Sequence, residues 1–284
     1  MTRRLVIAVD VSNTRLGIPS PGGLAGDRTF PTNRDYWTWL ENTARAAQAA
    51  WGSVPPEEAV LVLPAALTPM RRVLSMGVLY ANWAGPTVEM NLKEALGDIP
   101  VSVCEAAEAV LAGELSGTSS PKALTCVSWD AGITAATTAS DSLAATRVPI
   151  GHFPAPYAGN GLNCPCGVGC CVDLLVGAAG LRDFANGDFG NIRQEQWQHF
   201  HLRNFVQWAL VPLILTHPER EVVLSGSIID RLLNTREASI PVLKEVESLL
   251  DRFIGKRTLQ LRPPVRFATA KPISGGNQWI RRRH

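Results

Sequence analysis

The sequence lacks long hydrophobic runs and a strong excess of either charge. No apolar stretch approaches the roughly 20 residues of a membrane-spanning helix. The formal net charge is +2, and the basic clusters lie at the ends, at positions 3–4 and 281–283, where solvated tails are the ordinary interpretation. The first apolar run, 5–9, is too short for the core of a signal peptide. We therefore expect no membrane partner and no nucleic-acid partner, and a cytoplasmic location by default.

Cysteine is also scarce, and it is unevenly placed. Six cysteines are too few for a disulfide-stabilised scaffold in a chain of 284 residues. Four of them fall between positions 164 and 171, and such clustering is more typical of a metal site than of disulfides. Hydrophobic residues make up 46% and charged residues 18% of the chain, which predicts a globular protein with a substantial core.

Apolar runs that fit strands alternate with segments that fit helices. This alternation predicts an α/β layered fold. Two of the expected strands are followed by a polar turn with an aspartate, Asp10 in one half and Asp130 in the other, which hints at a duplicated architecture. A Gly/Ser/Thr/Pro stretch at 116–121 is the expected crossing, so we predict domains at 1–117 and 118–284. The expected strands are 5–9, 59–63, 100–103, 123–129 and 222–224, and the expected helices are 35–51, 105–114, 174–184, 199–215 and 242–253.

The strongest local motif runs Cys164-Pro165-Cys166-Gly167-Val168-Gly169-Cys170-Cys171. Structural zinc prefers thiolate and imidazole ligands in a closed tetrahedron. Cys164 and Cys166 are close enough to hold one ion from a tight turn, Cys171 can return as the third ligand, and His152 can supply the fourth. Spacing does not decide between Cys171 and its neighbour Cys170. The alternative is a set of reduced, partly buried thiols without an ion.

These residues resemble the signature of the ROK family, which comprises sugar kinases and sugar-responsive repressors. The family pattern is Gly-His, a short gap, then Cys-x-Cys-Gly-x-x-Gly-Cys-x-Glu, and this chain has Gly151-His152, Cys164-Pro165-Cys166-Gly167 and Cys171-Val172-Asp173. Cys170 stands in place of a glycine, and Asp173 in place of the glutamate. The resemblance implies the two-domain actin-like ATPase (ribonuclease H-like) fold of ROK sugar kinases with a zinc-binding loop. It also implies a homodimer, for which the 199–215 helix is a candidate interface.

The resemblance extends to the segments that bind nucleotide in the family. Segment 8–14 resembles the first phosphate turn, 130–136 takes the place of the second, and 210–227 resembles the adenosine segment. Asp10 ends a strand, where it can hold Mg²⁺ directly or through water, although a plain turn or capping role is the alternative. The residues that the resemblance places at ATP and Mg²⁺ are Asp10, Ser12, Asn13, Thr14, Asp130, Gly132, Thr134, Ser225 and Gly226.

At the positions that bind sugar in the family, this chain lacks several of the family's residues. Counted back from Gly113-Glu114, the family's catalytic aspartate falls at Ala106, and its sugar-binding asparagine falls at Glu105. A glutamate of the family is replaced by Pro149. Alanine cannot accept a proton, and loss of a general base typically costs about 10²–10⁴-fold in rate. The candidate substrate-binding residues are Asn82, Glu105, Glu108, His152 and Asp173.

Two functional hypotheses follow. The first is a sugar-kinase-like protein that binds a sugar or sugar-like ligand, with ATP as a candidate second ligand and with phosphotransfer in doubt because of Ala106. The alternative is an active ATP-dependent kinase of an unusual sugar or cyclitol, with Glu105 as its catalytic base. For Glu105 and Glu108 there is also a plainer interpretation, a solvated face of the helix.

Overall fold

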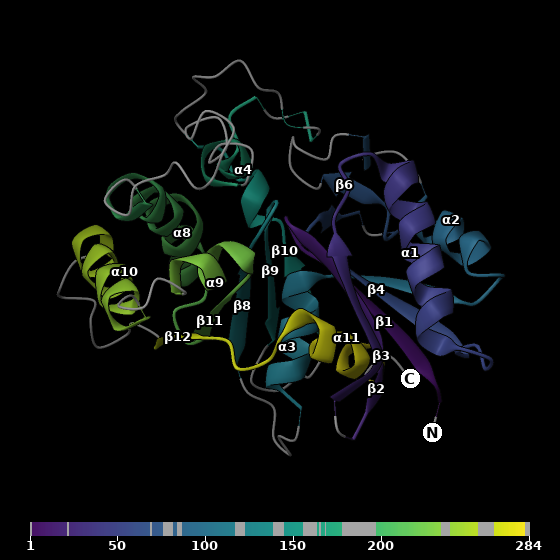
Figure 1. Ribbon diagram of the computed structural model, residues 1–284. Helices are drawn as coiled ribbons and strands as arrows, with labels where there is room; N and C mark the ends of the chain where they lie inside the picture. The colour runs from purple at the N-terminus through teal and green to yellow at the C-terminus, as the bar shows by residue number, and fades with distance from the viewer. Residues whose placement is uncertain are drawn as a thin grey trace.

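The computed structural model contains two five-stranded sheets, one in each half of the chain (Figure 1). It describes residues 2–21, 23–68, 70–75, 82–83, 87–116, 123–138, 145–155, 164, 166–167, 169–177, 197–233, 239–254 and 264–281. The two sheets form two lobes, and helices pack between them and on their outer flanks. Among the described helices, none is long and apolar enough to cross a bilayer.

The first sheet has the strand order β3-β2-β1-β4-β7. β1 and β2 are antiparallel, as are β2 and β3, whereas β1, β4 and β7 run parallel. The interior strands are continuous apolar runs because both of their faces are covered. The strand bounds are β1 Arg4–Val9, β2 Asn13–Ser20, β3 Gly23–Pro31, β4 Glu58–Leu63 and β7 Val101–Glu105, and the small β5 Ala66–Leu67 pairs with β6 Val73–Ser75.

The second sheet repeats this topology, in the order β10-β9-β8-β11-β12. Its first three strands again form an antiparallel meander, and β8, β11 and β12 run parallel. The duplicated architecture that the two strand–aspartate turns indicated is therefore present. The bounds are β8 Leu124–Trp129, β9 Ile133–Thr138, β10 Thr146–Val148, β11 Glu221–Ser225 and β12 Val265–Phe267.

Two helices, α3 (Ala106–Glu114) and α11 (Pro272–Arg281), pack against each other between the sheets. Their backbones approach so closely that a Cβ on Gly275 would overlap the carbonyl oxygen of Ala109. α11 also packs on β1 and β4, although it follows the last strand of the second sheet. The C-terminal helix thus lies on the first lobe, whereas the predicted division at 117 assigned its residues to the second.

The outer helices follow the apolar periodicity of the sequence. α1 begins after Asp35, whose side chain accepts a hydrogen bond from the Thr38 N–H, and α10 covers the predicted helix at 242–253. The predicted helix at 199–215 lies in one continuous helical stretch from 197 to 216, whereas most of the one at 174–184 lies outside the described residues. The bounds are α1 Tyr36–Trp51, α2 Val88–Ala95, η2 Ile150–His152, α4 Val172–Val176, η4 Trp197–Leu202, α7 Arg203–Phe205, η5 Val206–Leu210, α8 Val211–Thr216, α9 Ser227–Leu233 and α10 Ser239–Ile254.

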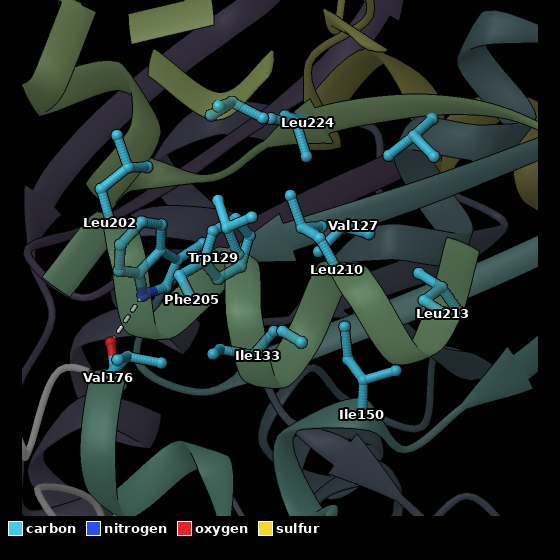
Figure 2. Close-up of a cluster of buried hydrophobic side chains, with 14 of the residues drawn as sticks. Val127, Trp129, Ile133, Ile150, Val176, Leu202, Phe205, Leu210, Leu213 and Leu224 are labelled. Atoms are coloured by element: carbon cyan, nitrogen blue, oxygen red, sulfur yellow. Dashed lines mark hydrogen bonds between the residues drawn. The ribbon is translucent and has the colours of Figure 1, made fainter. Parts of the chain in front are cut away.

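The core of the second lobe positions the cysteine-rich segment. Trp129 stacks on Phe205 with ring centroids 4.2 Å apart, and its indole N–H donates to the carbonyl of Val176 at 2.6 Å (Figure 2). Val176 ends α4, and Ile150, which begins η2, is buried in the same cluster. One apolar core therefore fixes both the helix that follows Cys171 and the turn that carries His152.

Candidate functional site

The structure brings His152 together with three of the clustered cysteines. One ligand atom from each of His152, Cys164, Cys166 and Cys171 lies within 4.8 Å of the others. Cys170 is not in this group, so the ambiguity that spacing left is resolved geometrically in favour of Cys171. Cys164 and Cys171 are buried, and Cys166 is partly exposed.

Backbone hydrogen bonds hold these side chains in position. Gly167 has a φ of 84° and donates its N–H to the Cys164 carbonyl at 2.9 Å, which closes the tight turn between the first two cysteines. Cys171 forms an antiparallel bridge with Pro154, just after the histidine turn. The chain therefore returns the third thiol to the imidazole through local pairing.

The donor set fits a zinc ion. Three thiols and one imidazole are the ligands of a closed structural zinc site, and their mutual spacing suits a tetrahedron. Hydrogen bonds from the Cys171 thiol and the His152 ring lower the pKa of Cys164, whereas the bond that Cys171 donates to Cys164 raises the pKa of Cys171, so Cys164 is the thiol of this pair that ionises first. The buried Nε2 of His152 has no hydrogen-bond partner among the described residues. These four side chains are therefore a group that could hold a zinc ion.

Asp173, at the position of the family's glutamate, lies beside the imidazole. Its Oδ2 is 4.0 Å from His152 Nδ1, and its Oδ1 accepts a hydrogen bond from the Ile133 N–H at 2.7 Å. Burial raises the pKa of the Asp173 carboxyl to about 6. Gly132 and Gly151 leave the space that this carboxyl occupies, since a Cβ on either would crowd its oxygens. Gly132, predicted at the phosphates, thus packs against Asp173.

Glu105 and Glu108 are buried, with 4% and 2% of their surface exposed. The interpretation of both as a solvated helix face is therefore wrong. Glu105 lies where β7 ends, and its Oε1 accepts the Leu67 N–H at 3.0 Å and lies 3.6 Å from Arg147 Nη1. Arg147 belongs to the second lobe and also donates to carbonyls of the first, so this ion pair joins the two lobes.

Glu108 is held by a bidentate pair with Arg71, at 2.6 and 3.1 Å. Its Oε2 also accepts the N–H of Glu105 at 3.0 Å, so it fixes the start of α3 as well. The Arg71 guanidinium lies over the ring of Trp279 at 5.1 Å from its centroid. Arg71 and Arg147 were both missed by sequence reasoning, because nothing in their local pattern marks a partner 37 or more positions away.

The buried position of Glu105 leads to a pH prediction. Burial raises the pKa of its carboxyl from 4.5 to about 7, so the folded chain retains a proton that the unfolded chain has released. The stability from this group is present below pH 4.5 and is lost as the pH rises toward 7, by up to about 3 kcal/mol. We expect Glu105→Gln to flatten this fall in the free energy of unfolding, measured by urea denaturation from pH 4.5 to 7.5.

Glu94→Gln is the matched control, because Glu94 is an exposed glutamate of α2. It is expected to leave the pH dependence as in the parent chain. If Glu105→Gln and Glu94→Gln give the same profile, the raised pKa of Glu105 is contradicted.

A cleft of about 330 Å³ opens between the lobes, away from the cysteines. Asp10 lines it from the first lobe and Asp130 from the second. Asp10 is half-buried, and its Oδ1 accepts the N–H groups of Ser12 and Asn13 at 2.6 and 2.7 Å, so it orders its own turn. Its other oxygen has no hydrogen bond to a described residue, which leaves one carboxylate oxygen for a cation in the cleft.

Asp130 is more deeply engaged. Its two oxygens accept hydrogen bonds from the Ser227 N–H and the Ser128 hydroxyl, both at 2.7 Å. Burial raises the pKa of its carboxyl, and the nearby charge of Asp10 adds to the rise. A cation in the cleft would relieve both effects, since it favours ionised carboxylates.

The other predicted nucleotide residues divide into two groups. Ser225 and Gly226 line the cleft together with Ser227 of the same segment, and Asp230 and Lys271, which the sequence did not reveal, line it as well. Lys271 pairs with Asp230 at 2.9 and 3.0 Å. Lys271 follows β12, a strand of three residues that is too short to produce a recognisable pattern in the sequence.

Thr14 and Thr134 are both buried away from the cleft. The Thr14 hydroxyl accepts the indole N–H of Trp39 and pairs with the Thr32 hydroxyl, both at 2.9 Å. The Thr14 hydroxyl is therefore engaged within the core, and contact of Thr14 with phosphate stays a prediction. Thr134 lies on β9 with 2% of its surface exposed. Asn82 is exposed and makes no hydrogen bond to a described residue.

Gly226 is required at its place in the cleft wall. Its φ is 112°, and an added Cβ would overlap the backbone of Trp129. We expect Gly226→Ala to lower the free energy of unfolding by about 3 kcal/mol or more. Gly97→Ala, at a φ of 74° with nothing within 4 Å of the new methyl, is expected to cost only about 1–2 kcal/mol. Equal losses in urea denaturation would show that contact with Trp129 is unimportant.

Comparison with known proteins shows which solved structures share this fold. No protein-family model and no curated protein matches the sequence. Solved structures do match it. A ROK-family glucokinase from Streptomyces griseus, in complex with glucose and AMPPNP, has a TM-score of 0.71 at 15% identity, covering 99% of this chain and 100% of that one.

Two other solved structures give the same result. An inorganic polyphosphate/ATP-glucomannokinase from Arthrobacter sp. strain KM has a TM-score of 0.68 at 16% identity, covering 100% of both chains. A ROK hexokinase from Thermus thermophilus has a TM-score of 0.64 at 19% identity, covering 98% of this chain and 97% of that one. The chain therefore has the two-lobed, actin-like fold of the ROK sugar kinases over essentially its whole length.

Proposed function

We propose that this chain is a ROK-family protein that binds a sugar or sugar-like ligand between its lobes and has lost most or all phosphotransfer. The observation that carries the proposal is the residue type at the first position of helix α3. By the sequence resemblance, the family's catalytic aspartate falls there at Ala106, whose side chain is 1% exposed. A methyl group cannot accept the proton of a substrate hydroxyl. The neighbouring Glu105 and Glu108 are both held by arginines.

The ligand would lie where the two lobes meet near Glu105, His152 and Asp173. Support comes from Arg147, which reaches from the second lobe to Glu105 and to the β5 segment of the first. His152 and Asp173 lie next to each other on the second lobe, and the charge of Glu105 acts on the His152 ring. Carboxylate, imidazole and guanidinium groups at one place are suited to hydrogen-bonding the hydroxyls of a polyol.

Zinc is proposed at His152, Cys164, Cys166 and Cys171, as a structural ion that adds binding free energy to the folded state. ATP and Mg²⁺ are proposed in the interlobe cleft. Asp10 would face the cation, and the Ser225–Ser227 turn would face the nucleotide. A homodimer is proposed through the 197–216 helical stretch, whose Leu215 side chain is 60% exposed.

A paired screen tests the proposed function. Zinc-loaded protein is mixed with hexoses, amino sugars and cyclitols, with and without ATP and Mg²⁺. Thermal unfolding and ATP consumption are then measured on the same samples. We expect at least one sugar to raise the unfolding temperature, because a ligand that binds only the folded state stabilises it, while ATP consumption stays at background. The absence of stabilisation by every sugar in folded, zinc-loaded protein would contradict the proposal.

The alternative is an active kinase with Glu105 as its base. One observation favours it: the pKa of the buried Glu105 carboxyl is raised to about 7, which suits proton transfer near neutral pH. In that case the same screen gives ATP turnover with one sugar, and Glu105→Gln lowers it by about 10²–10⁴-fold. Glu94→Gln would leave turnover unchanged.

A further inference from the structure

A second cavity lies on the first lobe, where the edge strand β3, the turn after it and helix α1 supply its lining. Its volume is about 770 Å³, within the range of small-molecule sites. Residues 28–34, from the end of β3 into the following turn, form one side. Positions 42, 45, 46 and 49 of α1 form the other, and they share one face because they follow helical spacing. None of the residues that line the interlobe cleft is among them.

The lining carries one sign of charge. Arg28 comes from β3, Arg34 from the turn and Arg45 from α1, and no acidic residue lines the cavity. All three arginines are exposed, and none forms an ion pair within the described part of the chain. By contrast, Arg15 on the neighbouring strand is paired with Asp27 through two hydrogen bonds. Three arginines without an ion-pair partner in the described part of the chain, from β3, the following turn and α1, thus line one cavity.

The nearby acidic groups lie outside the lining of the cavity, and one of them, Asp27, is paired with a cation. Asp27 is engaged by Arg15, and Asp35 accepts the N–H and the hydroxyl of Thr38 at 2.8 Å each. Glu41 is exposed on α1 outside the lining. The remaining lining offers amide groups at Asn33 and Asn42, and an apolar floor that includes Phe30 and Ala46, both packed against the core.

We propose that this β3–α1 cavity binds a phosphate-bearing small molecule, with Arg28, Arg34 and Arg45 holding its phosphate oxygens. Guanidinium groups bind phosphate in a bidentate manner, and three of them match a ligand with more than one negative charge. The amides and the apolar floor suit the uncharged part of such a ligand. This proposal does not depend on what binds between the lobes.

Two other occupants fit the cavity less well. An added β-strand would pair along the edge of β3, but Pro31 removes a hydrogen-bond donor there, and proline and charged side chains blunt an edge strand. A second copy of the chain, docked about a two-fold axis, would bring identical arginines against each other. Neither occupant supplies negative charge to pair with the three arginines of the lining.

The test uses the full zinc-loaded chain and inorganic pyrophosphate as the probe, without Mg²⁺ and at constant ionic strength. The Nε–H signals of Arg28, Arg34 and Arg45 are followed by ¹H–¹⁵N NMR. We expect these three signals to shift and saturate together. The Arg28→Gln/Arg45→Gln double variant should bind pyrophosphate at least about tenfold more weakly, because it loses two charge-assisted contacts. Arg252→Gln, which removes an exposed arginine of α10, should leave the affinity unchanged.

Two results would overturn the proposal. The first is saturation of backbone signals around Asp10 and Ser227 with no response from the three arginines, since pyrophosphate would then bind only in the interlobe cleft. The second is an equal loss of affinity in the double variant and in Arg252→Gln, which would indicate general attraction of anions to a positive surface. The double variant is expected to fold, because its side chains are exposed and have no partner in the described structure.

Discussion

Replacing Cys171 with serine is expected to abolish zinc binding, whereas replacing its neighbour Cys170 with serine is expected to preserve it. Cys171 lies with His152, Cys164 and Cys166 within 4.8 Å, and Cys170 lies outside that group. Loss of a ligand from a structural zinc site removes binding free energy that belongs to folding, so we expect the free energy of unfolding to fall by about 3 kcal/mol or more in Cys171→Ser. Mass spectrometry under native conditions gives the zinc content, and urea denaturation gives the stability.

The two cysteines are adjacent, so the pair controls for the general effect of a serine in this segment. Cys170→Ser should retain one zinc per chain and change the free energy of unfolding by less than about 1 kcal/mol. Should Cys170→Ser lose its zinc while Cys171→Ser retains it, the ligand set drawn from the geometry is wrong. If neither variant differs from a parent chain that itself carries no zinc, the four side chains form a thiol cluster and no metal site.

Ala106→Asp is expected to create or raise phosphotransfer to the sugar that binds most tightly. An aspartate at the first position of α3 would supply a proton acceptor at the position that the sequence resemblance assigns to the family's base, and such a base is worth about 10²–10⁴-fold when the rest of the site is in place. The measurement is ATP-dependent phosphorylation of that sugar, followed by mass spectrometry of the product. Circular dichroism first checks that the buried substitution leaves the chain folded.

Ala106→Asn is the matched control, since it adds nearly the same volume without a basic carboxylate. We expect it to remain at the level of the parent chain. An equal gain in both variants would indicate a change of shape or flexibility. No gain in a folded Ala106→Asp chain that still binds the sugar would show that the site no longer holds its ligands in line for transfer.

Much of the fold follows from apolar patterns that lie close together in the sequence. β1, β4, β8 and β11 are buried runs that the sequence marks as strands, and α1 and α10 have clear helical periodicity. β3 and α11 carry weaker signals. β3 is almost wholly exposed, so its strand form depends on pairing with β2. α11 contains Gly275 and Gly276, which usually indicate a turn, and here they allow its close approach to α3 and β4.

The parts of the candidate site were predictable to different degrees, depending on how far apart in the sequence their residues lie. The cysteine spacing and one histidine identified the metal cluster, because its ligands lie within twenty residues of each other. Spacing alone left Cys170 as an alternative, the family resemblance pointed to Cys171, and the pairing of Cys171 with Pro154 gives the structural reason. The burial of Glu105 and its approach to Arg147 depend on two lobes meeting, and no local pattern encodes that meeting. The contact of the Thr14 hydroxyl with Trp39 is equally remote in the sequence and was not predicted.

The central claim, a sugar-like ligand held between the lobes beside an absent base, is tested most directly by a crystal structure of zinc-loaded protein soaked with a sugar that stabilises it. The claim predicts density for the sugar within hydrogen-bond reach of Glu105 or Asp173, with the methyl of Ala106 facing the hydroxyl that a kinase of this fold would phosphorylate. Sugar density elsewhere on the molecule, with this region occupied only by water, would contradict it.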